Sequence, residues 1–249
     1  MELKFSIITV VKNDEKHISR TIKSIIKQNY NNIQYIVIDG NSKDSTLKVI
    51  NSYKGDIDKI ISEPDNGIYE AMNKGIELSS GDVICFCNSG DILRQDAIKT
   101  IAKYFMNTKI DFVFGTVWRF YTGKKILKYN FNPDRIKYNF DCYTSHSTGF
   151  YIRKEAQKKI GNYNTKFKCS ADYDLFYKMI IKFKMIGLTT TNKEIIGVVR
   201  SGGYSSTLNY IDHLFEETKI RISNQQNILF IAVIFITHFF KKTFRKIFY

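Results

Sequence analysis

The sequence lacks the patterns that mark several common classes of protein. Its four cysteines form no C-x-x-C pair and no zinc-binding spacing with the four histidines, so a sulfur-ligated metal is not expected. It contains neither a G-x-G-x-x-G fingerprint nor a P-loop, which leaves dinucleotide-binding and P-loop functions without support. The N-terminal apolar run, Phe5 to Val11, is too short and wrongly flanked for a signal peptide. These absences favour a protein of the reducing cytosol.

The composition is that of one folded domain of enzyme size. The chain has 249 residues, of which 43% are hydrophobic and 25% charged, and no linker rich in proline or glycine divides it. That length suffices for a sizeable core. The balance excludes a wholly disordered, collagen-like or multi-span membrane protein.

Positive charge is concentrated in the second part of the chain. The first hundred residues carry 13 Lys+Arg against 14 Asp+Glu, or −1, and the other 149 carry 25 against 10, or +15. Such asymmetry favours an anionic partner, although a solvated Lys-rich surface is the plain alternative. The basic residues are scattered and no nucleic-acid-binding module is recognisable, so nucleic acid is not expected as the partner.

Apolar runs of strand length alternate with helical patterns from residue 5 to about residue 117. The predicted strands are 5–11, 35–38, 59–61, 83–87 and 112–117, and the predicted helices are 18–26, 46–52, 68–78 and 98–105. This alternation predicts an α/β fold with a mainly parallel sheet covered by helices on both faces. Further along, a hairpin is expected over Arg119 to Asn130, a helix over Leu175 to Ile186 and a mobile loop over Arg200 to Ser206.

Three polar clusters each follow a predicted strand immediately. They are Lys12 to Asp14, Asp39 to Ser42 and Asn88 to Asp91. Because ligands of parallel sheets bind beyond the carboxyl ends of the strands, these clusters are expected to converge on one edge of the sheet and form a site there.

Four acidic residues in polar segments admit two interpretations each. Asp91 suits a hard divalent cation that brings a diphosphate with it, or it caps the next helix. Asp39 suits hydrogen bonds from a nucleoside, or it is a turn residue. Asp172 and Asp174 would project about 200° apart on a helix, so one is expected to be functional and the other structural, unless both merely favour the helix N-terminus. His146 is either a phosphate or metal ligand or an ordinary loop histidine.

Taken in order, these segments resemble the family 2 glycosyltransferases of GT-A fold, particularly bacterial members that build surface polysaccharides. The resemblance lies in five blocks and extends from residue 5 to about residue 206. The blocks are 5–13, 36–46, 62–76, 81–91 and 170–176.

The resemblance implies a role for each matching residue. Asp39 would bind the nucleotide base, with help from the main chain at Thr9 to Val11 and from the side chain of Asn13. The other donor-binding residues would be Asn66, Asn73, Lys74, Asn88, Ser89 and Gly90. Asp91 would hold Mg²⁺ or Mn²⁺, although Asn88 and Gly90 stand where other members often carry aspartate. His146 and Arg200 would lie on the acceptor or diphosphate side.

Asp172 would match the catalytic base of the family. It would take the proton of an acceptor hydroxyl as that oxygen attacks the anomeric carbon, while the metal offsets charge on the leaving diphosphate. A single displacement of this kind inverts the anomeric centre. The implied enzyme is an inverting hexosyl- or N-acetylhexosaminyltransferase that uses a nucleotide-diphosphate sugar, with a UDP-sugar as the first expectation, and a glycan or lipid-linked acceptor. The alternatives are a non-catalytic nucleotide-sugar-binding or membrane-associated assembly protein and, less favoured, a nucleotidyltransferase.

The C-terminal segment combines an apolar run with basic residues. Residues 228–240 carry no formal charge apart from His238, and Lys241, Lys242, Arg245 and Lys246 follow. Thirteen helical residues would span roughly 20 Å, less than a bilayer core. We therefore expect residues 226–249 to lie on an anionic membrane at its cytosolic face, the alternative being a helix packed on protein. Residues 1–225 are expected to form the GT-A domain, with a donor half, 1–117, and an acceptor half, 118–225.

Overall fold

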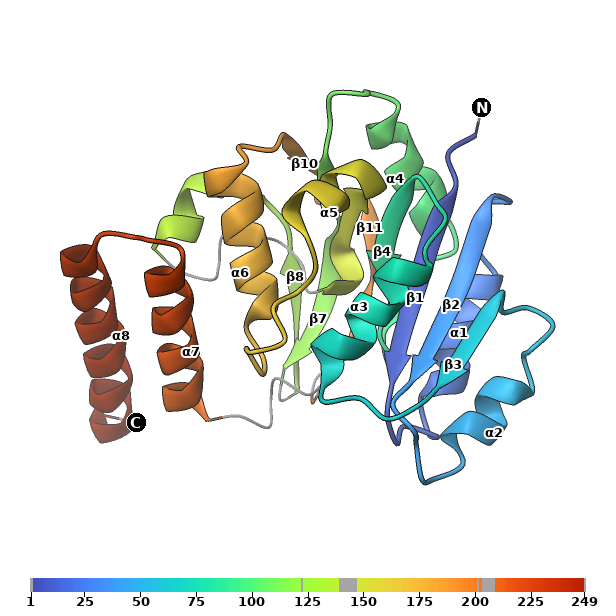
Figure 1. Cartoon of the computed structure of the whole chain (residues 1–249), viewed down its shortest axis with the longest axis horizontal. Coiled ribbons are helices and arrows are strands. Elements are labelled where there is room, and N and C mark those ends of the chain that lie inside the picture. Colours follow the sequence, from blue (N-terminus) through green and yellow to red (C-terminus); the bar gives the residue numbers. More distant parts are fainter. Residues whose placement is uncertain (1, 122, 139–146, 201, 203–208, 249) are drawn as a thin grey trace.

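The computed structural model describes residues 2–121, 123–138, 147–200, 202 and 209–248 (Figure 1). Its centre is a seven-stranded sheet with the strand order β10-β6-β9-β4-β1-β2-β3, in which β9 alone runs antiparallel to its neighbours. The strands of this sheet are β1 (Phe5–Val11), β2 (Ile33–Asp39), β3 (Lys59–Ser62), β4 (Val83–Phe86), β6 (Phe112–Phe114), β9 (Phe150–Arg153) and β10 (Gly187–Thr189). The predicted, mainly parallel α/β sheet is confirmed.

Helices cover both faces of this sheet (Figure 1). They are α1 (Ile18–Ile26), α2 (Thr46–Asn51), α3 (Ile68–Leu78), α4 (Ala97–Phe105), α5 (Lys154–Ile160) and α6 (Ala171–Tyr177). Alternate residues of β1 face opposite layers, so Ile8 packs in the cluster that contains residues of α3 and α6, whereas Ile7 packs with α1 and α4. β1 reads as a continuous apolar run because both of its faces are buried.

A second, four-stranded sheet has the order β5-β11-β7-β8. Its strands are β5 (Ile92–Leu93), β11 (Ile195–Val199), β7 (Thr116–Tyr121) and β8 (Lys124–Lys128). β7 and β8 form the hairpin predicted over residues 119–130. One-turn helices cover Pro133–Lys137 (η1) and Ser147–Gly149 (η3).

Two predicted elements have the wrong bounds. The strand predicted over 112–117 is divided between the two sheets at Gly115, whose N–H donates to the Gly149 carbonyl at 2.7 Å. A Cβ there would lie 2.6 Å from Ile196 Cγ1, so glycine lets the chain cross between sheets. The helix predicted over 175–186 begins at Ala171 and ends in a π-helical turn, Lys178–Lys182 (η4), because the chain must leave the helix to form β10.

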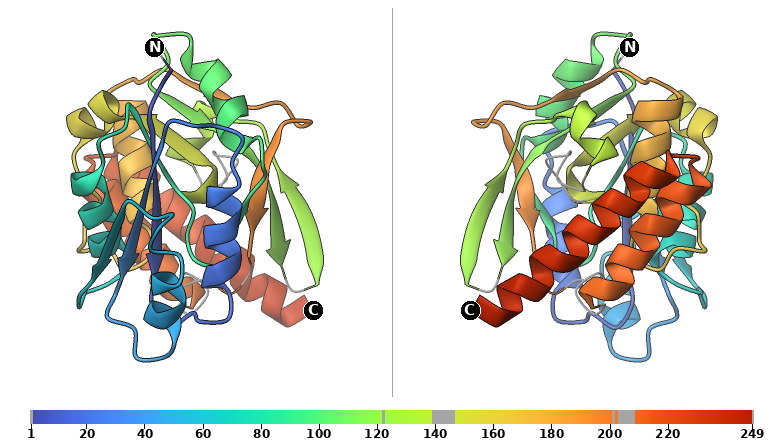
Figure 2. Two further views of the ribbon diagram at one scale, coloured as in Figure 1. Left: turned by 90° about the vertical axis from the view of Figure 1, so that its right-hand side faces the viewer. Right: turned by 90° about the vertical axis from the view of Figure 1, so that its left-hand side faces the viewer.

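Two antiparallel helices, α7 (Tyr210–Ser223) and α8 (Ile228–Phe248), form a hairpin at one end of the molecule (Figures 1 and 2). The Phe215 and Phe235 rings lie 5.7 Å apart, and the Tyr210 hydroxyl donates to the His238 carbonyl at 3.0 Å. α8 therefore packs on α7 and extends beyond the predicted apolar run. Within the described residues, no helix is both long and apolar enough to cross a bilayer.

Candidate functional site

The three polar clusters meet at the carboxyl edge of the large sheet, as the sequence predicted. The main-chain N–H of Asn13 donates to Ser42 Oγ at 2.8 Å, which joins the loops after β1 and β2. Ser89 Oγ donates to Asp14 Oδ2 at 2.7 Å, which joins the loops after β1 and β4. Side chains from three separate stretches of the chain are thus held together by direct hydrogen bonds.

Asp39 is fully buried at the end of β2. Its carboxylate accepts hydrogen bonds from the Ser42 N–H at 3.1 Å and from the Ser42 and Ser62 hydroxyls at 2.5 and 2.6 Å. Such hydrogen bonds are typical of a turn residue, which is one of the two interpretations that the sequence allowed for Asp39. Binding of a nucleotide base by Asp39 stays a prediction, and it requires the surrounding loops to open because the residue is fully buried.

The expected main-chain site after β1 is occupied by neighbouring loops. Thr9 is fully buried, and its hydroxyl donates to the Cys87 carbonyl at 2.8 Å. The Val11 carbonyl accepts from the Gly40 N–H at 2.9 Å. Asn13 has a positive φ of 50° and accepts from the Lys43 N–H through Oδ1 at 2.7 Å. These residues shape the edge of the sheet.

Asn66 and Lys74 hold the loop that precedes α3. The Asn66 side-chain amide donates to Glu70 Oε2 at 2.8 Å. Lys74 Nζ lies 2.9 Å from Glu63 Oε1 and 3.2 Å from Glu70 Oε1. Both predicted donor-binding side chains are therefore engaged by carboxylates in this structure.

Asn73 bridges α3 to the segment before α6. Its amide group donates to the Tyr163 carbonyl and accepts from the Tyr163 N–H, each at 2.9 Å. The Tyr163 ring in turn stacks on Tyr69 at 5.5 Å. Asn73 thus acts on the fold of the site rather than pointing an open polar group into it.

Asp91 is buried at the end of the Asn88 to Asp91 turn. Its Oδ1 accepts from the Arg200 N–H at 2.9 Å, and its Oδ2 accepts from the Thr148 hydroxyl. Burial raises the pKa of Asp91 to about 6, against the lowering effect of these hydrogen bonds. Asp91 joins the loop after β4 to the loop after β11.

The Arg200 side chain lies against Gly90 and the loop after β1. A Cβ at position 90 would be 2.6 Å from Arg200 Nε, and Gly90 has a positive φ of 91°. Arg200 Nη1 contacts His17 Nδ1 and lies 3.5 Å from Asp14 Oδ1. Among the described residues, the buried Nε finds no hydrogen-bond acceptor.

Asn88 carries the second buried polar atom without a partner at this edge. Its Nδ2 donates to Ser147 Oγ at 2.9 Å, while its Oδ1 has no donor within the part of the chain that the structure describes. Buried polar atoms are normally satisfied, so each exception calls for an explanation. An unmet donor on Arg200 and an unmet acceptor on Asn88 both belong to the contact region around Gly90.

Asp172 lies in the first turn of α6 and is half-buried. Its Oδ1 accepts from the Tyr173 N–H at 2.9 Å and faces the Tyr69 hydroxyl at 3.4 Å. Burial raises the pKa of Asp172 to about 6, which is suited to a proton acceptor at neutral pH. The pKa of Asp172 is raised because few hydrogen-bond donors replace the water that the carboxylate loses on burial.

Asp174 has a different environment, as the helical spacing predicted. It is buried, forms an ion pair with Lys178 at 2.6 Å, and accepts from Asn224 Nδ2 at 2.7 Å. Asp174 therefore links α6 to the C-terminal hairpin. Within the described residues, Asp172 is the carboxylate of this pair that has no cationic side chain bonded to it.

Arg119 on β7 connects the turn after β4 with α6 electrostatically. Its positive charge lowers the pKa of both Asp91 and Asp172, although burial outweighs it in each case. Both carboxylates therefore lie within electrostatic range of the same cationic side chain. Sequence reasoning missed Arg119, because a basic residue within a basic hairpin gives no local signal.

Helix α7 holds the segment that leads into α6. Glu216 Oε2 accepts from the N–H groups of Cys169 and Ser170, both at 3.1 Å, and Oε1 accepts from the Lys168 N–H at 2.5 Å. Burial opposes ionisation of Glu216, but these hydrogen bonds prevail and lower its pKa. The Arg221 guanidinium lies 5.4 Å from the Tyr173 ring. The sequence did not predict this helix, so it gave no sign of these contacts.

The residues predicted for a metal ion fit one poorly. Both oxygens of Asp91 already accept from protein donors, and the Arg200 side chain lies beside the same turn. Within the described ranges, no three His, Cys, Asp or Glu side chains are grouped to bind a cation. His146, the other predicted ligand, lies outside the described residues. A cation at Asp91 would share the carboxylate with Thr148 and with the Arg200 N–H.

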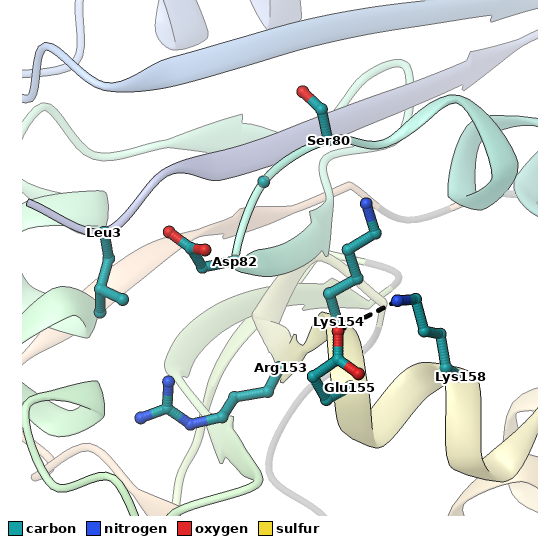
Figure 3. Close-up of a pocket in the computed structure, with 8 residues that line it drawn as sticks. Leu3, Ser80, Asp82, Arg153, Lys154, Glu155 and Lys158 are labelled. Atoms are coloured by element: carbon teal, nitrogen blue, oxygen red, sulfur yellow. Dashed lines mark hydrogen bonds and ion pairs between the residues drawn. The ribbon is translucent and has the colours of Figure 1, made fainter.

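A cavity of about 370 Å³ lies elsewhere, at the amino ends of β1 and β4 (Figure 3). Leu3, Asp82 and Arg153 line it together with Ser80, Gly81, Lys154, Glu155 and Lys158. Its charged groups are engaged, since Arg153 Nε donates to the Ile110 carbonyl and Lys154 Nζ to the Ser79 carbonyl. This cavity is at the edge of the sheet opposite the clustered polar residues and adds nothing to the site.

The chain belongs to glycosyl transferase family 2, whose family model matches residues 6–178. A PGL/p-HBAD biosynthesis glycosyltransferase of Mycobacterium bovis is 28% identical over 175 residues, which is 68% of this chain and 67% of that protein. An uncharacterized glycosyltransferase of Mycobacterium tuberculosis is 41% identical over 87 residues. That match spans only 34% of this chain and 33% of the relative.

Solved structures share the fold. Staphylococcus aureus TarS in complex with UDP superposes with a TM-score of 0.69 and 18% identity, covering 93% of this chain and 65% of that chain. A mannosyltransferase from Pyrobaculum calidifontis, in complex with GDP-Man and Mn²⁺, has a TM-score of 0.68 and 14% identity, with coverages of 91% and 65%. The GT-A fold that the sequence predicted is thereby confirmed.

Proposed function

We propose that the protein transfers a sugar from a nucleotide-diphosphate sugar to an acceptor hydroxyl with inversion, and that Asp172 is the general base. The observation that carries this proposal is the half-buried Asp172 carboxylate, with its pKa raised to about 6, within electrostatic range of the same cationic side chain as Asp91 at the polar edge of a GT-A sheet. The UDP and GDP-Man complexes of proteins with this fold support a nucleotide-sugar donor. UDP is our first candidate for the nucleotide.

In this mechanism the donor lies along the carboxyl ends of β1, β2 and β4. The acceptor hydroxyl approaches Asp172, which removes its proton as the oxygen attacks the anomeric carbon. The Tyr69 hydroxyl, 3.4 Å from Asp172 Oδ1, and the Tyr173 N–H orient the carboxylate. The bond to the diphosphate breaks as the new glycosidic bond forms. No step is assigned to a metal ion, because no three His, Cys, Asp or Glu side chains are grouped to bind one in the described part of the chain.

A donor panel tests the proposal directly. Purified protein is heated with UDP-, GDP- and TDP-sugars, each with EDTA or with Mn²⁺, and donor hydrolysis and transfer to a lipid-linked or free glycan are followed. Stabilisation by one nucleotide class, with acceptor-dependent release of the nucleoside diphosphate, is expected. Stabilisation without any release would favour the alternative function, a non-catalytic nucleotide-sugar-binding protein. No stabilisation by any donor would contradict both.

We further propose that the C-terminal hairpin docks on an anionic membrane surface. Three apolar side chains spaced along α8 are exposed: Leu229 by 75%, Val233 by 58% and Ile236 by 52%. On α7, Phe215 and Ile222 are also about half exposed. Lys241, Lys242, Arg245 and Lys246 follow in α8, which contains no acidic residue. Apolar residues with adjoining basic ones favour anionic lipid over a second copy of this basic chain.

The orientation of the hairpin suits a lipid-linked acceptor at the cytosolic face. The C-terminal end of α8 and the carboxyl ends of β1 and β2 lie on the same side of the molecule (Figure 1). Docking through that end would bring the polar edge of the sheet towards the bilayer. α7 also contacts the segment before Asp172 through Glu216, so the hairpin is continuous with the acceptor side of the site.

Vesicle co-sedimentation tests the docking. Wild type is expected to bind vesicles that contain phosphatidylglycerol, less so at high salt, and to bind pure phosphatidylcholine weakly. The double variant Ile236→Glu/Phe240→Glu, at two half-exposed positions nearer the C-terminal end of α8, is expected to lose binding. Met106→Glu is the matched control, because Met106 is 76% exposed at the end of α4. Unchanged binding by the double variant, or self-association in place of vesicle binding, would contradict the proposal.

A further inference from the structure

We propose that the guanidinium of Arg200 binds the diphosphate of the donor and supplies there the positive charge that the sequence assigned to a metal ion. This inference rests on the proposed function for the class of donor. The inference goes beyond the proposed function in two ways. It names the group that meets the leaving diphosphate, and it makes donor binding independent of a divalent cation.

Position 90 shows how the arginine comes to lie at the end of the strand. Where the family resemblance leads one to expect a further aspartate, this chain has Gly90, with a positive φ of 91°. A Cβ at that position would lie 2.6 Å from Nε and 2.9 Å from Cζ of Arg200. An aspartate side chain and the guanidinium cannot both occupy this space. The absence of an aspartate at position 90 is therefore what makes room for the Arg200 guanidinium.

The anchoring of Arg200 is compatible with such a role. Its main-chain N–H is fixed to Asp91 Oδ1 at 2.9 Å, so the residue is tied to the turn after β4. The side chain remains 32% exposed, which leaves it within reach of a ligand. Asp14 lies 3.5 Å from Nη1, at the long end of a hydrogen bond, and orients the guanidinium while neutralising only part of its charge.

The unmet hydrogen-bonding capacity of the side chain points to an anionic ligand. The buried Nε–H has no acceptor among the described residues. A guanidinium presents its N–H groups in a planar fork that matches two phosphate oxygens, and such charge-assisted pairs are among the strong hydrogen bonds. A diphosphate would meet the exposed part of the guanidinium, and a rotation of the side chain away from Gly90 would bring Nε–H to one of its oxygens. The field of Arg119, which also reaches Asp91, adds positive charge at the same place.

A divalent metal ion, the alternative source of positive charge, would find fewer uncommitted ligands at this edge of the sheet. Each oxygen of Asp91 already accepts one hydrogen bond, from Thr148 or from the Arg200 N–H, so a cation there would share the carboxylate with these donors. Asp14, the nearest further carboxylate, is engaged by Ser89 and contacts His17. The negative groups at this edge are therefore committed to protein donors, whereas the donor capacity of Arg200 is incompletely used.

Calorimetric titration of the full-length protein tests this inference. UDP and GDP are each compared with their nucleosides, in EDTA and again with Mn²⁺, for wild type, Arg200→Ala and Arg200→Lys. Arg94→Ala serves as a control, because Arg94 is an exposed arginine whose main chain makes hydrogen bonds with Gln28, Ile196 and Ala97 that the substitution leaves in place. Circular dichroism verifies that each variant is folded.

In EDTA, wild type is expected to bind the diphosphate at least tenfold more tightly than the nucleoside. Arg200→Ala should lose that difference with nucleoside affinity unchanged, and Arg200→Lys should retain only part of it because a lysine lacks the fork. A diphosphate advantage that needs Mn²⁺ and survives in Arg200→Ala would overturn the inference. If neither nucleotides nor nucleosides bind under any condition, the proposed function itself fails.

Discussion

The first 117 residues and the remainder of the chain position their polar side chains in different ways. In the first part, Asp39 is satisfied by Ser42, three residues later, and by Ser62 at the end of the adjacent strand. In the second part, Asp172 faces Tyr69, 103 residues away, and the segment before it is held by Glu216 on α7. The edge of the sheet is built by strand ends and turns, whereas the base is placed by packing between distant segments.

This difference extends to the chemistry of the carboxylates. Three hydrogen-bond donors surround the buried carboxylate of Asp39. Asp172 has one main-chain donor and a long contact with a tyrosine, so burial raises its pKa to about 6. Satisfied carboxylates stabilise the frame of the site, while an under-satisfied one is available to accept a proton. This contrast agrees with the proposed function, in which the first part holds the donor and the second part supplies the base.

The strongest test of this comparison is Asp172→Asn. Loss of the general base is expected to lower the rate of transfer about 10²- to 10⁴-fold with nucleotide binding unchanged, as measured by steady-state kinetics and calorimetry. Burial raises the pKa of Asp172 from an ordinary 3.8 to about 6, so its ionisation destabilises the fold increasingly as pH rises between these values and by a constant amount above them. The variant should therefore be more stable at pH 7.5, by about 1 to 2 kcal/mol.

Asp174→Asn is the matched control, two residues further along α6. It weakens an ion pair with Lys178 and is expected to lower stability with a much smaller effect on transfer. If Asp172→Asn retained wild-type turnover, the base would have to be sought outside α6.

The next test addresses the long-range support of α6. Glu216→Gln keeps the size of the side chain but loses the charge that holds the N–H groups of Lys168, Cys169 and Ser170. A small displacement of Asp172 is expected to lower kcat by about tenfold to a hundredfold, with the KM for the donor unchanged. Glu155→Gln, at an exposed position of α5, should leave both parameters unchanged. An increase in donor KM with kcat intact would place Glu216 on the donor side and break the comparison.

The smallest effect is expected from pH. Because the base must be ionised and its pKa is raised to about 6, kcat should fall as pH decreases through 6 and approach a tenfold loss per unit below it. Rates measured between pH 5 and 8 with saturating substrates, together with nucleotide affinity at each pH, test this. A rate that stays constant down to pH 4.5 would show that the base has the pKa of an ordinary, solvated aspartate.

The features that the sequence predicted correctly depend on local patterns. β1 and α3 have the predicted bounds because a buried parallel strand is continuously apolar and an amphipathic helix repeats every 3.6 residues. The convergence of the loops after β1, β2 and β4 followed from the parallel order of those strands. The separation of Asp172 from Asp174 followed from helical geometry.

The features that the sequence missed depend on contacts between distant segments. Gly115 divides a predicted strand because Ile196 and Gly149 approach it from elsewhere in the fold. The helix predicted to reach residue 186 ends early because β10 must pair with β6. Helix α7 was not predicted at all, and its support of α6 is visible only once the chain has folded.

By itself, the sequence determined the order of strands and helices as far as residue 114 and the edge of the sheet at which polar residues gather, since both are encoded in neighbouring residues. The candidate base came from the family resemblance. The tertiary structure alone decided which of the polar residues are already satisfied. It placed Arg200 against Gly90, engaged both oxygens of Asp91, and set α7 behind Asp172. The physical reason is that hydrogen-bond satisfaction and burial, which fix the charge and pKa of a side chain, depend on partners that lie far away in the sequence.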